Sequence, residues 1–106
     1  QSMNTSDWIY VKEYKIKDPT GADGKYTGNV GKFTGIPSGH GRLQFANGGY
    51  YGGDWDRGLW SGYGRTRDKR NGDLYEGEFL DDCKHGKGST VFVDGRTLHG
   101  RYIFGN

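Results

Sequence analysis

The 106-residue chain has little of what stabilises an ordinary soluble domain. Only 31% of its residues are hydrophobic, its mean hydropathy is −0.94, and no apolar run is long enough to span a bilayer. Its one cysteine, Cys83, excludes an internal disulfide and favours an intracellular protein over a secreted one. The formal net charge of +2 gives no support to nucleic-acid binding, so no nucleic-acid partner is predicted.

Glycine and aromatic residues take the place of the missing aliphatic side chains. The chain has 21 glycines, and aromatic residues make up 15% of it. Disordered chains are poor in aromatic residues, so this composition argues against disorder. It predicts β structure that is stabilised by the packing of rings, in a chain long enough for one domain.

The sequence repeats with spacings of 24 and then 23 residues. Units start at Tyr51, Tyr75 and Leu98, and each reads ring-or-Leu, any residue, Gly, any residue, aromatic. A Gly-x-Gly follows eleven residues after the two full starts, and a looser copy from Tyr26 carries a two-residue insertion around residues 34–38. Each unit alternates at period two and ends in an Asn-Gly or Asp-Gly turn, which predicts a β-hairpin.

This pattern resembles the MORN repeat (membrane occupation and recognition nexus), whose units begin Tyr-x-Gly-x-Trp/Phe and continue with Gly-x-Gly. The predicted fold is all-β: an elongated, twisted single-sheet meander of antiparallel β-hairpins, with about three units and a partial fourth. The expected divisions are an expression scar at 1–3, an N-terminal capping strand and turn at 4–25, and a MORN array at 26–50, 51–74, 75–97 and 98–106.

Residues 7–17 are rich in β-forming residues, and we expect them to form the capping strand that covers the first edge of the sheet. The alternative is a strand that pairs with a second protomer.

Antiparallel pairing predicts that large rings lie beside glycines. Inside the hairpins, the expected glycine pairs are Gly28–Gly41, Gly53–Gly64 and Gly77–Gly88. The expected ring partners are Gly62 and Gly41 for Trp55, and Gly86 and Gly64 for Phe79. A ring over glycine backbone protects a weakened strand. On the opposite face, the expected charge pairs are Arg42–Asp54, Arg65–Glu78, Arg67–Glu76 and Lys87–Glu78.

No group of residues in the sequence supports catalysis, so the chain is predicted not to be an enzyme and to hold no cofactor. The stretch KHGKGST lacks the spacing of a phosphate-binding loop. The spacing of Cys83 and His85 does not match a zinc site, and His40 and His99 add no second ligand pair. No metal site is predicted within the chain, although an interfacial metal between protomers stays open. Asp81 and Asp82 are interpreted as solvated loop residues.

We therefore predict a non-catalytic interaction or scaffolding module. It would present an aromatic- and glycine-lined groove to a protein or peptide partner or to a second protomer, and the resemblance implies scaffolds, accessory modules and, in several cases, homodimers. The candidate partner-binding residues are Trp60, Tyr63, Tyr51, Trp55, Tyr75 and Phe79. Trp60 stands in a predicted loop, where it is either an exposed anchor or a lid folded over the core.

The alternative is a peripheral membrane module that binds anionic phospholipid, which the family's name suggests. Lys69 and Arg70 lie near a turn and are the cations most available to a lipid headgroup. A further alternative is an accessory piece that folds beside a catalytic domain. The expected location is the cytoplasm, with association to the cytoskeleton or to the inner face of a membrane.

Overall fold

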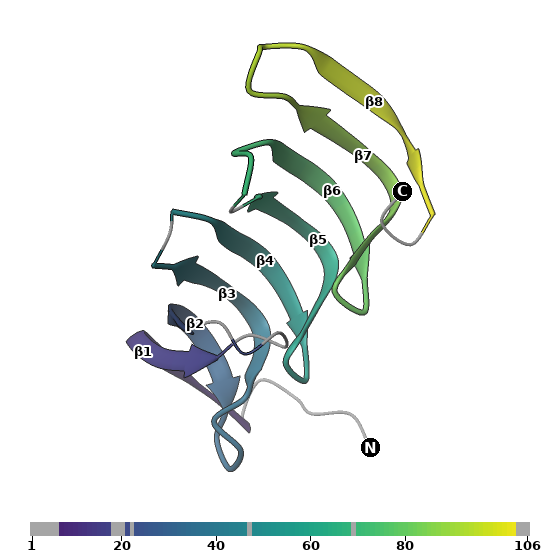
Figure 1. Cartoon of the computed structure of the whole chain (residues 1–106). Coiled ribbons are helices and arrows are strands. Elements are labelled where there is room, and N and C mark those ends of the chain that lie inside the picture. Colours follow the sequence, from purple (N-terminus) through teal and green to yellow (C-terminus); the bar gives the residue numbers. More distant parts are fainter. Residues whose placement is uncertain (1–6, 18–20, 22, 47, 69, 104–106) are drawn as a thin grey trace.

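The computed structural model describes residues 7–17, 21, 23–46, 48–68 and 70–103. They form a single eight-stranded sheet in which each strand pairs with the next one along the chain (Figure 1). The strands are β1 (Trp8–Lys17), β2 (Asp23–Gly31), β3 (Pro37–Phe45), β4 (Tyr50–Asp56), β5 (Leu59–Arg67), β6 (Leu74–Leu80), β7 (Cys83–Val91) and β8 (Thr97–Tyr102). Every pairing is antiparallel, so the predicted all-β hairpin meander is confirmed.

The two ends of the sheet are formed by β1 and β8. β1 pairs with β2 from Trp8 opposite Gly31 to Lys17 opposite Asp23, which confirms the predicted capping strand. β8 pairs with β7 and is the first strand of the partial fourth unit. The proposed expression scar at 1–3 lies outside the described residues.

A continuous row of glycines crosses the sheet from β2 to β8. In strand order it consists of Gly28, Gly41, Gly53, Gly64, Gly77, Gly88 and Gly100. The glycine pairs predicted inside the hairpins are therefore confirmed. The row also continues between hairpins, where Gly41 faces Gly53 and Gly64 faces Gly77.

The predicted partners of the large rings are wrong by two residues. Trp55 faces Trp60 and Gly39 instead of Gly62 and Gly41, and Phe79 faces Lys84 and Gly62 instead of Gly86 and Gly64. Inside a hairpin, a β-bulge directly after Gly53 or Gly77 shifts the pairing beyond it. Between hairpins each turn is centred one residue earlier than predicted, as the bond from the Phe45 amide to the Gly49 carbonyl shows for the turn after β3.

The same shifts change the predicted charge pairs on the outer face. In the structure Asp54 faces His40, Arg65 faces Glu76, Arg67 faces Leu74 and Lys87 faces Arg101. Arg65 therefore bonds Glu76, at 3.0 Å, and not Glu78. The predicted pairs Arg42–Asp54 and Arg67–Glu76 are therefore wrong, whereas Glu78 lies at the bulge between Gly77 and Phe79, where the register gives it no partner on β7.

The Gly-x-Gly motif has a different reason for each of its glycines. The first glycine of the motif has a positive φ, +60° at Gly62 in the second unit and +71° at Gly86 in the third. Residues other than glycine rarely adopt this backbone conformation. The second one, such as Gly64, lies under the ring of its own unit's tyrosine: a Cβ there would come within 2.5 Å of the Tyr51 hydroxyl.

Each of these tyrosines also bonds the backbone at the bulge. The hydroxyl of Tyr26 donates to the carbonyl of Asn29 at 2.7 Å, that of Tyr51 to Asp54 at 2.7 Å and that of Tyr75 to Glu78 at 3.0 Å. A bulge disrupts the regular ladder, and a buried carbonyl needs a donor. This bond explains why the unit begins with tyrosine, because phenylalanine could not supply it.

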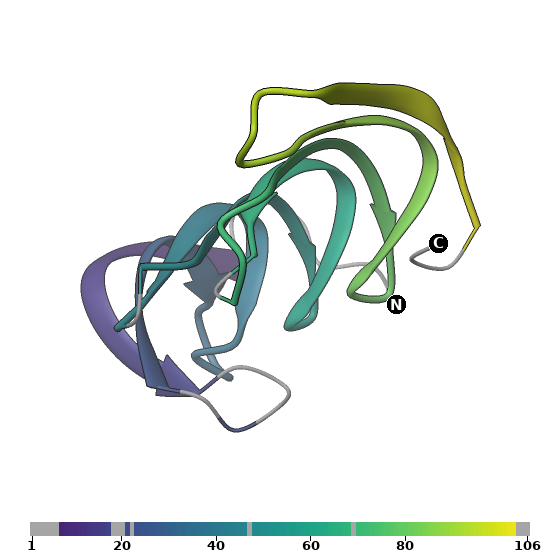
Figure 2. The same ribbon diagram turned by 45° about the horizontal axis from the view of Figure 1, so that its top comes forward.

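The core lies on one face of the rolled sheet. Figure 2 shows the strands bending together, so that the sheet curls about its long axis. The buried hydrophobic residues are Tyr26, Val30, Leu43, Phe45, Tyr51, Trp55, Tyr75, Phe79 and Tyr102. We call their face the inner face. Rolling lets a single sheet bury rings at its own centre without a second layer, which is how a chain with few aliphatic residues folds.

Candidate functional site

The inner face carries a ladder of aromatic rings. Neighbouring rings meet edge to face, with centroids 4.9 to 5.3 Å apart, in the order Tyr26, Trp55, Tyr51, Phe79, Tyr75, Tyr102. Such pairs each contribute about 0.5–1.5 kcal/mol beyond the burial of area. Tyr51, Trp55, Tyr75 and Phe79, four of the candidate partner-binding residues, are at most 5% exposed. Their role in binding stays a prediction, and their position in the structure is in the core.

Trp60 is the ring that lies at the border of this core. It stands at the start of β5, stacks flat on Tyr51 with centroids 4.5 Å apart, and contacts Phe79. Its backbone is fixed by Asp82 of the next hairpin, whose carboxylate accepts from the Trp60 amide at 2.6 Å and whose own amide donates to the Trp60 carbonyl at 2.9 Å. Asp82 is therefore a structural anchor, which the interpretation as a solvated loop residue missed.

Lys84 occupies in the third hairpin the position that Trp60 occupies in the second. Each stands two residues before the first glycine of its Gly-x-Gly, and each faces the large ring of its own hairpin, Trp55 or Phe79. The Lys84 ammonium lies 5.1 Å from the centre of the Tyr75 ring. It covers this tyrosine by a cation–π contact, as Trp60 covers Tyr51 by stacking. The common spacing to Gly-x-Gly would have revealed Lys84 from the sequence.

Trp60 and Lys84 border a hollow of about 390 Å³, which we call the Trp60 groove. Its apolar lining comes from Phe45, Trp60, Leu74 and Tyr75, and its charged lining from Arg67, Asp68, Arg70, Asp73 and Lys84. These residues belong to the ends of several strands, which the curl of the sheet brings together. The hollow has the size and the mixed lining of a small binding pocket.

A family comparison agrees with this repeated geometry. Three consecutive stretches, residues 35–50, 51–72 and 75–95, match the family model described as MORN repeat, and together they cover more than half of the chain. The chain belongs to the MORN-repeat family. The resemblance seen in the sequence is thereby confirmed, whereas a comparison with curated proteins gave no match.

Membership in this family sets the general class of function. MORN repeats are non-catalytic modules that mediate interactions with proteins or membranes, and MORN proteins are typically membrane-associated or cytosolic. The described part of this MORN chain contains no helix that is long and apolar enough to cross a membrane. The matches begin at residue 35, so the predicted start of the first unit at Tyr26 stays a prediction.

Tyr63 lies on the other face of the MORN sheet, away from Trp60. Its ring is 55% exposed, and its hydroxyl donates to a carboxylate oxygen of Glu76 at 2.8 Å, while Arg65 holds the other oxygen at 3.0 Å. The hydrogen bond from Tyr63, followed by Arg65, lowers the pKa of Glu76, and the same bond raises the pKa of Tyr63. The two predicted binding rings, Trp60 and Tyr63, are therefore not brought together.

The candidate lipid-binding residues follow β5. Arg70 is exposed and lies 3.7 Å from Asp68, whose carboxylate also accepts from the Arg70 amide at 2.7 Å. That amide is the main cause of a lowered pKa for Asp68. Lys69 lies outside the described residues.

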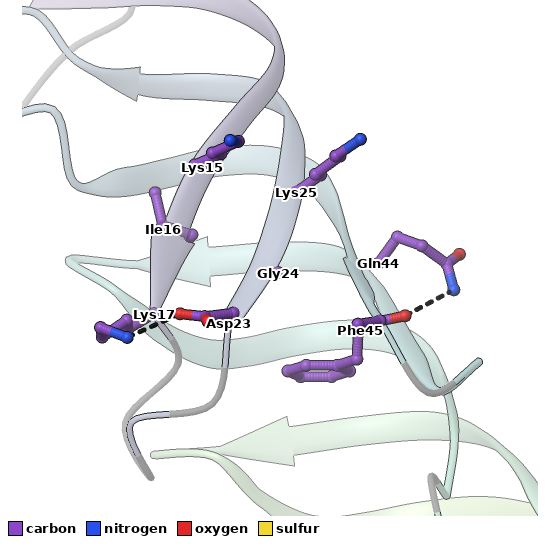
Figure 3. A pocket seen from close by; sticks show the side chains of 9 residues that line it. Lys15, Ile16, Lys17, Asp23, Gly24, Lys25, Gln44 and Phe45 are labelled. Carbon is purple, nitrogen blue, oxygen red and sulfur yellow. Dashed lines mark hydrogen bonds and ion pairs between the residues drawn. The ribbon is translucent and has the colours of Figure 1, made fainter.

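Two further hollows lie along the MORN array, and the first of them adjoins the Trp60 groove. One, of about 700 Å³, lies at the ends of β1, β2 and β3 and shares Phe45 with the groove. Figure 3 shows this hollow, with the ion pair of Lys17 and Asp23 at the strand ends and with Lys25 and the Phe45 ring pointing in different directions. The other, of about 280 Å³, shares Ile16 with it and reaches Trp55.

The described residues contain no group of three or more His, Cys, Asp and Glu side chains that could hold a metal ion. Cys83 is partly buried at the start of β7, next to Lys84. Two histidines, His40 of β3 and His99 of β8, lie on the outer face. A ring nitrogen of His40 lies 3.4 Å from the Asp54 carboxylate, and one of His99 lies 2.6 Å from the Ser89 hydroxyl.

Proposed function

We propose that this MORN array is a non-catalytic interaction module that binds a segment of a protein partner in the Trp60 groove. The observation that carries the proposal is the position of Trp60. Its ring stacks on the buried Tyr51, while its edge borders an open hollow of about 390 Å³. A tryptophan held rigid by the core and open on one side is the type of residue that dominates binding energy at interfaces.

The rigidity of this position supports the proposal further. The backbone of Trp60 is bonded to Asp82 in both directions, and its ring is held between Tyr51 and Phe79. A pre-formed pocket avoids the cost of ordering side chains when the partner binds. The indole Nε1 is itself buried and has no hydrogen-bond partner in the described part of the chain, so the contact offered to a bound segment is that of the apolar ring.

The proposal is tested by selecting ligands from a display library of random short peptides against the purified chain. Selected peptides are synthesised, and their affinities are measured by calorimetry for the wild type and for Trp60→Ala. We expect a loss of about thirtyfold or more, because truncation of an interface hot spot costs about 2 kcal/mol. Trp60→Leu, which keeps more of the packing on Tyr51, is measured as well in case the alanine variant folds poorly.

Phe33→Ala is the matched control, because Phe33 is an 82% exposed ring outside the groove. Its loss should leave the affinities unchanged. Peptides that bind both Trp60 variants as tightly as the wild type would show that the groove is not the binding site.

Binding to anionic phospholipid is the second candidate function, and one observation favours it. Lys15 faces Lys25 directly across strands, and Lys87 faces Arg101 in the same way. Like charges in these positions repel one another, and an anionic surface would relieve that repulsion. Sedimentation with phosphoinositide-containing vesicles tests this function: we expect binding that weakens with salt and with Lys87→Gln. Vesicles that leave the protein in the supernatant at low salt would rule it out.

A further inference from the structure

The equivalence of Trp60 and Lys84 divides the Trp60 groove into two chemically different halves. Trp60 covers Tyr51 with an apolar ring, whereas Lys84 covers Tyr75 with an ammonium group that also lies 5.8 Å from the Tyr102 ring. A cation at this position is not required by the fold, because the preceding hairpin has an indole there. Lys84 is partly buried, and its ammonium lies beside two aromatic rings.

No carboxylate among the described residues forms an ion pair with Lys84, and the two acids of the groove have other partners. Asp68 accepts from the amide of Arg70 at 2.7 Å, and Asp73 accepts from the amide of Val93 at 3.2 Å. Both acids are therefore used to hold turns. Arg67 lines the groove as well and faces Leu74 rather than an acid. Arg70 pairs with Asp68 at 3.7 Å, so Lys84 and Arg67 are the two groove cations that form no ion pair with a described residue.

We infer that the partner segment bound in the Trp60 groove is acidic, with a carboxylate over Lys84 and an apolar side chain against Trp60. This inference rests on the proposed function and adds the chemistry of the partner to it. A partner carboxylate supplies the counter-charge that Lys84 lacks, in surroundings where rings limit access of water and charge pairs are stronger than at an exposed surface.

The geometry also sets the spacing of the two groups in the partner. Trp60 is on β5 and Lys84 on β7, two strand spacings apart, or about 10 Å. An extended segment that crosses the strands covers this distance with about three residues, and a helix covers it with about two turns. The carboxylate and the apolar side chain should therefore recur at one of these two separations.

The experiment uses the peptides selected from the display library described above. Each peptide that depends on Trp60 is compared with its amide analogue, in which Asp is replaced by Asn and Glu by Gln, and both are measured against the wild type and Lys84→Met. We expect enrichment of Asp and Glu, a loss of about tenfold for the amide analogue on the wild type, and a similar loss for the acidic peptide on Lys84→Met. The two losses should not add, because they remove the same contact.

Lys87→Met is the matched control, since Lys87 is on the same strand but on the outer face, opposite Arg101. It should leave the affinity of the acidic peptide unchanged. An equal loss for Lys87→Met and Lys84→Met would mean that only overall charge matters and would overturn the inference. In a charge reversal, Lys84→Glu should lose the acidic peptide and bind its lysine counterpart.

The outcomes separate this inference from the proposed function. If no selected peptide depends on Trp60, the proposed function fails. If peptides depend on Trp60 but show no excess of acidic residues, or bind Lys84→Met unchanged, the proposed function stands and the acidic partner is wrong. Light scattering tests a second copy as the occupant: self-association that is lost in Trp60→Ala would identify the chain itself as the partner and overturn the inference.

Discussion

The ring of Tyr51 lies over Gly64 on the neighbouring strand, and its hydroxyl donates to the carbonyl of Asp54 at 2.7 Å. One side chain thus covers a glycine of the central row and bonds the backbone at the bulge. The arrangement recurs with Tyr26 over Gly41 and with Tyr75 over Gly88. This contact joins the two strands of each hairpin. Because the ring lies directly on the glycine, the packing of the array is sensitive to the addition of a single methyl group at that position.

Gly64→Ala should destabilise the protein by about 1–3 kcal/mol, because the new Cβ would lie 2.5 Å from the Tyr51 hydroxyl oxygen and 2.7 Å from its ring. Gly100→Ala is the control on the same row, since no atom lies within 4 Å of a Cβ there. It should change stability by less than about 0.5 kcal/mol. Urea unfolding of the three proteins measures the difference, and equal midpoints for the two variants would contradict the packing described.

Trp55→Phe should cost about 1–3 kcal/mol, because it removes the indole N–H that donates to the carbonyl of Gly41 at 3.0 Å in the core. Trp8→Phe makes the same chemical change where the indole nitrogen has no partner among the described residues. It should cost clearly less. Thermal unfolding compares the two variants, and a larger loss for Trp8→Phe would show that the Trp55 bond is unimportant.

The core tyrosines should control stability at alkaline pH. Burial raises the pKa of Tyr75 to about 12 and raises the pKa values of Tyr26 and Tyr51 as well, whereas an unfolded tyrosine ionises near about 10. Because the folded pKa is raised, this contribution is complete below pH about 10 and is lost as the pH rises toward about 12. Ultraviolet absorbance of phenolate and circular dichroism follow the two events. Full ionisation near pH about 10 with the fold intact would contradict the burial.

Tyr63→Phe should raise the pKa of Glu76 toward its ordinary value, because the Tyr63 hydroxyl is the main cause that lowers it. The Arg65 ion pair remains in this variant, so the return should be partial. Nuclear magnetic resonance of the Glu76 side chain during acid titration measures the change. Tyr14→Phe is a control on an exposed ring of β1, and it should leave the Glu76 titration where it is. A Glu76 titration that is the same with and without the Tyr63 hydroxyl would refute the assignment.

The sequence alone predicts the hairpin meander, the capping strand and the glycine pairs inside each hairpin. These depend on alternation, spacing and turn residues, which are local. The partners of Trp55 and Phe79 are missed because a β-bulge after Gly53 or Gly77 leaves no mark in the alternation. The charge pairs between hairpins are missed because the register there depends on the residue at which a turn is centred, and an Asn-Gly signal does not specify that residue.

The candidate site is only partly predictable for a related reason. Trp60 is recognisable from the sequence as a ring outside the repeat pattern. The two predicted alternatives, an exposed anchor and a lid over the core, each describe it in part, since its ring packs on Tyr51 and borders a hollow. Tyr63 and Trp60 are close in sequence, but the bulge and the alternation of the strand place them on opposite faces. The role of Asp82 depends on contact between successive loops, which no pattern within one repeat reveals.

The glycine row restricts where this sequence can change length. The loop after β2 carries extra residues and the turn after β5 is longer than the one after β3, yet Gly28 still faces Gly41 and Gly64 still faces Gly77. A residue inserted inside a strand would move a side chain onto the row and turn every residue beyond it to the opposite face. We therefore expect insertions and deletions at the turns or at a β-bulge, and a longer array would continue from β8 with the second strand of its hairpin.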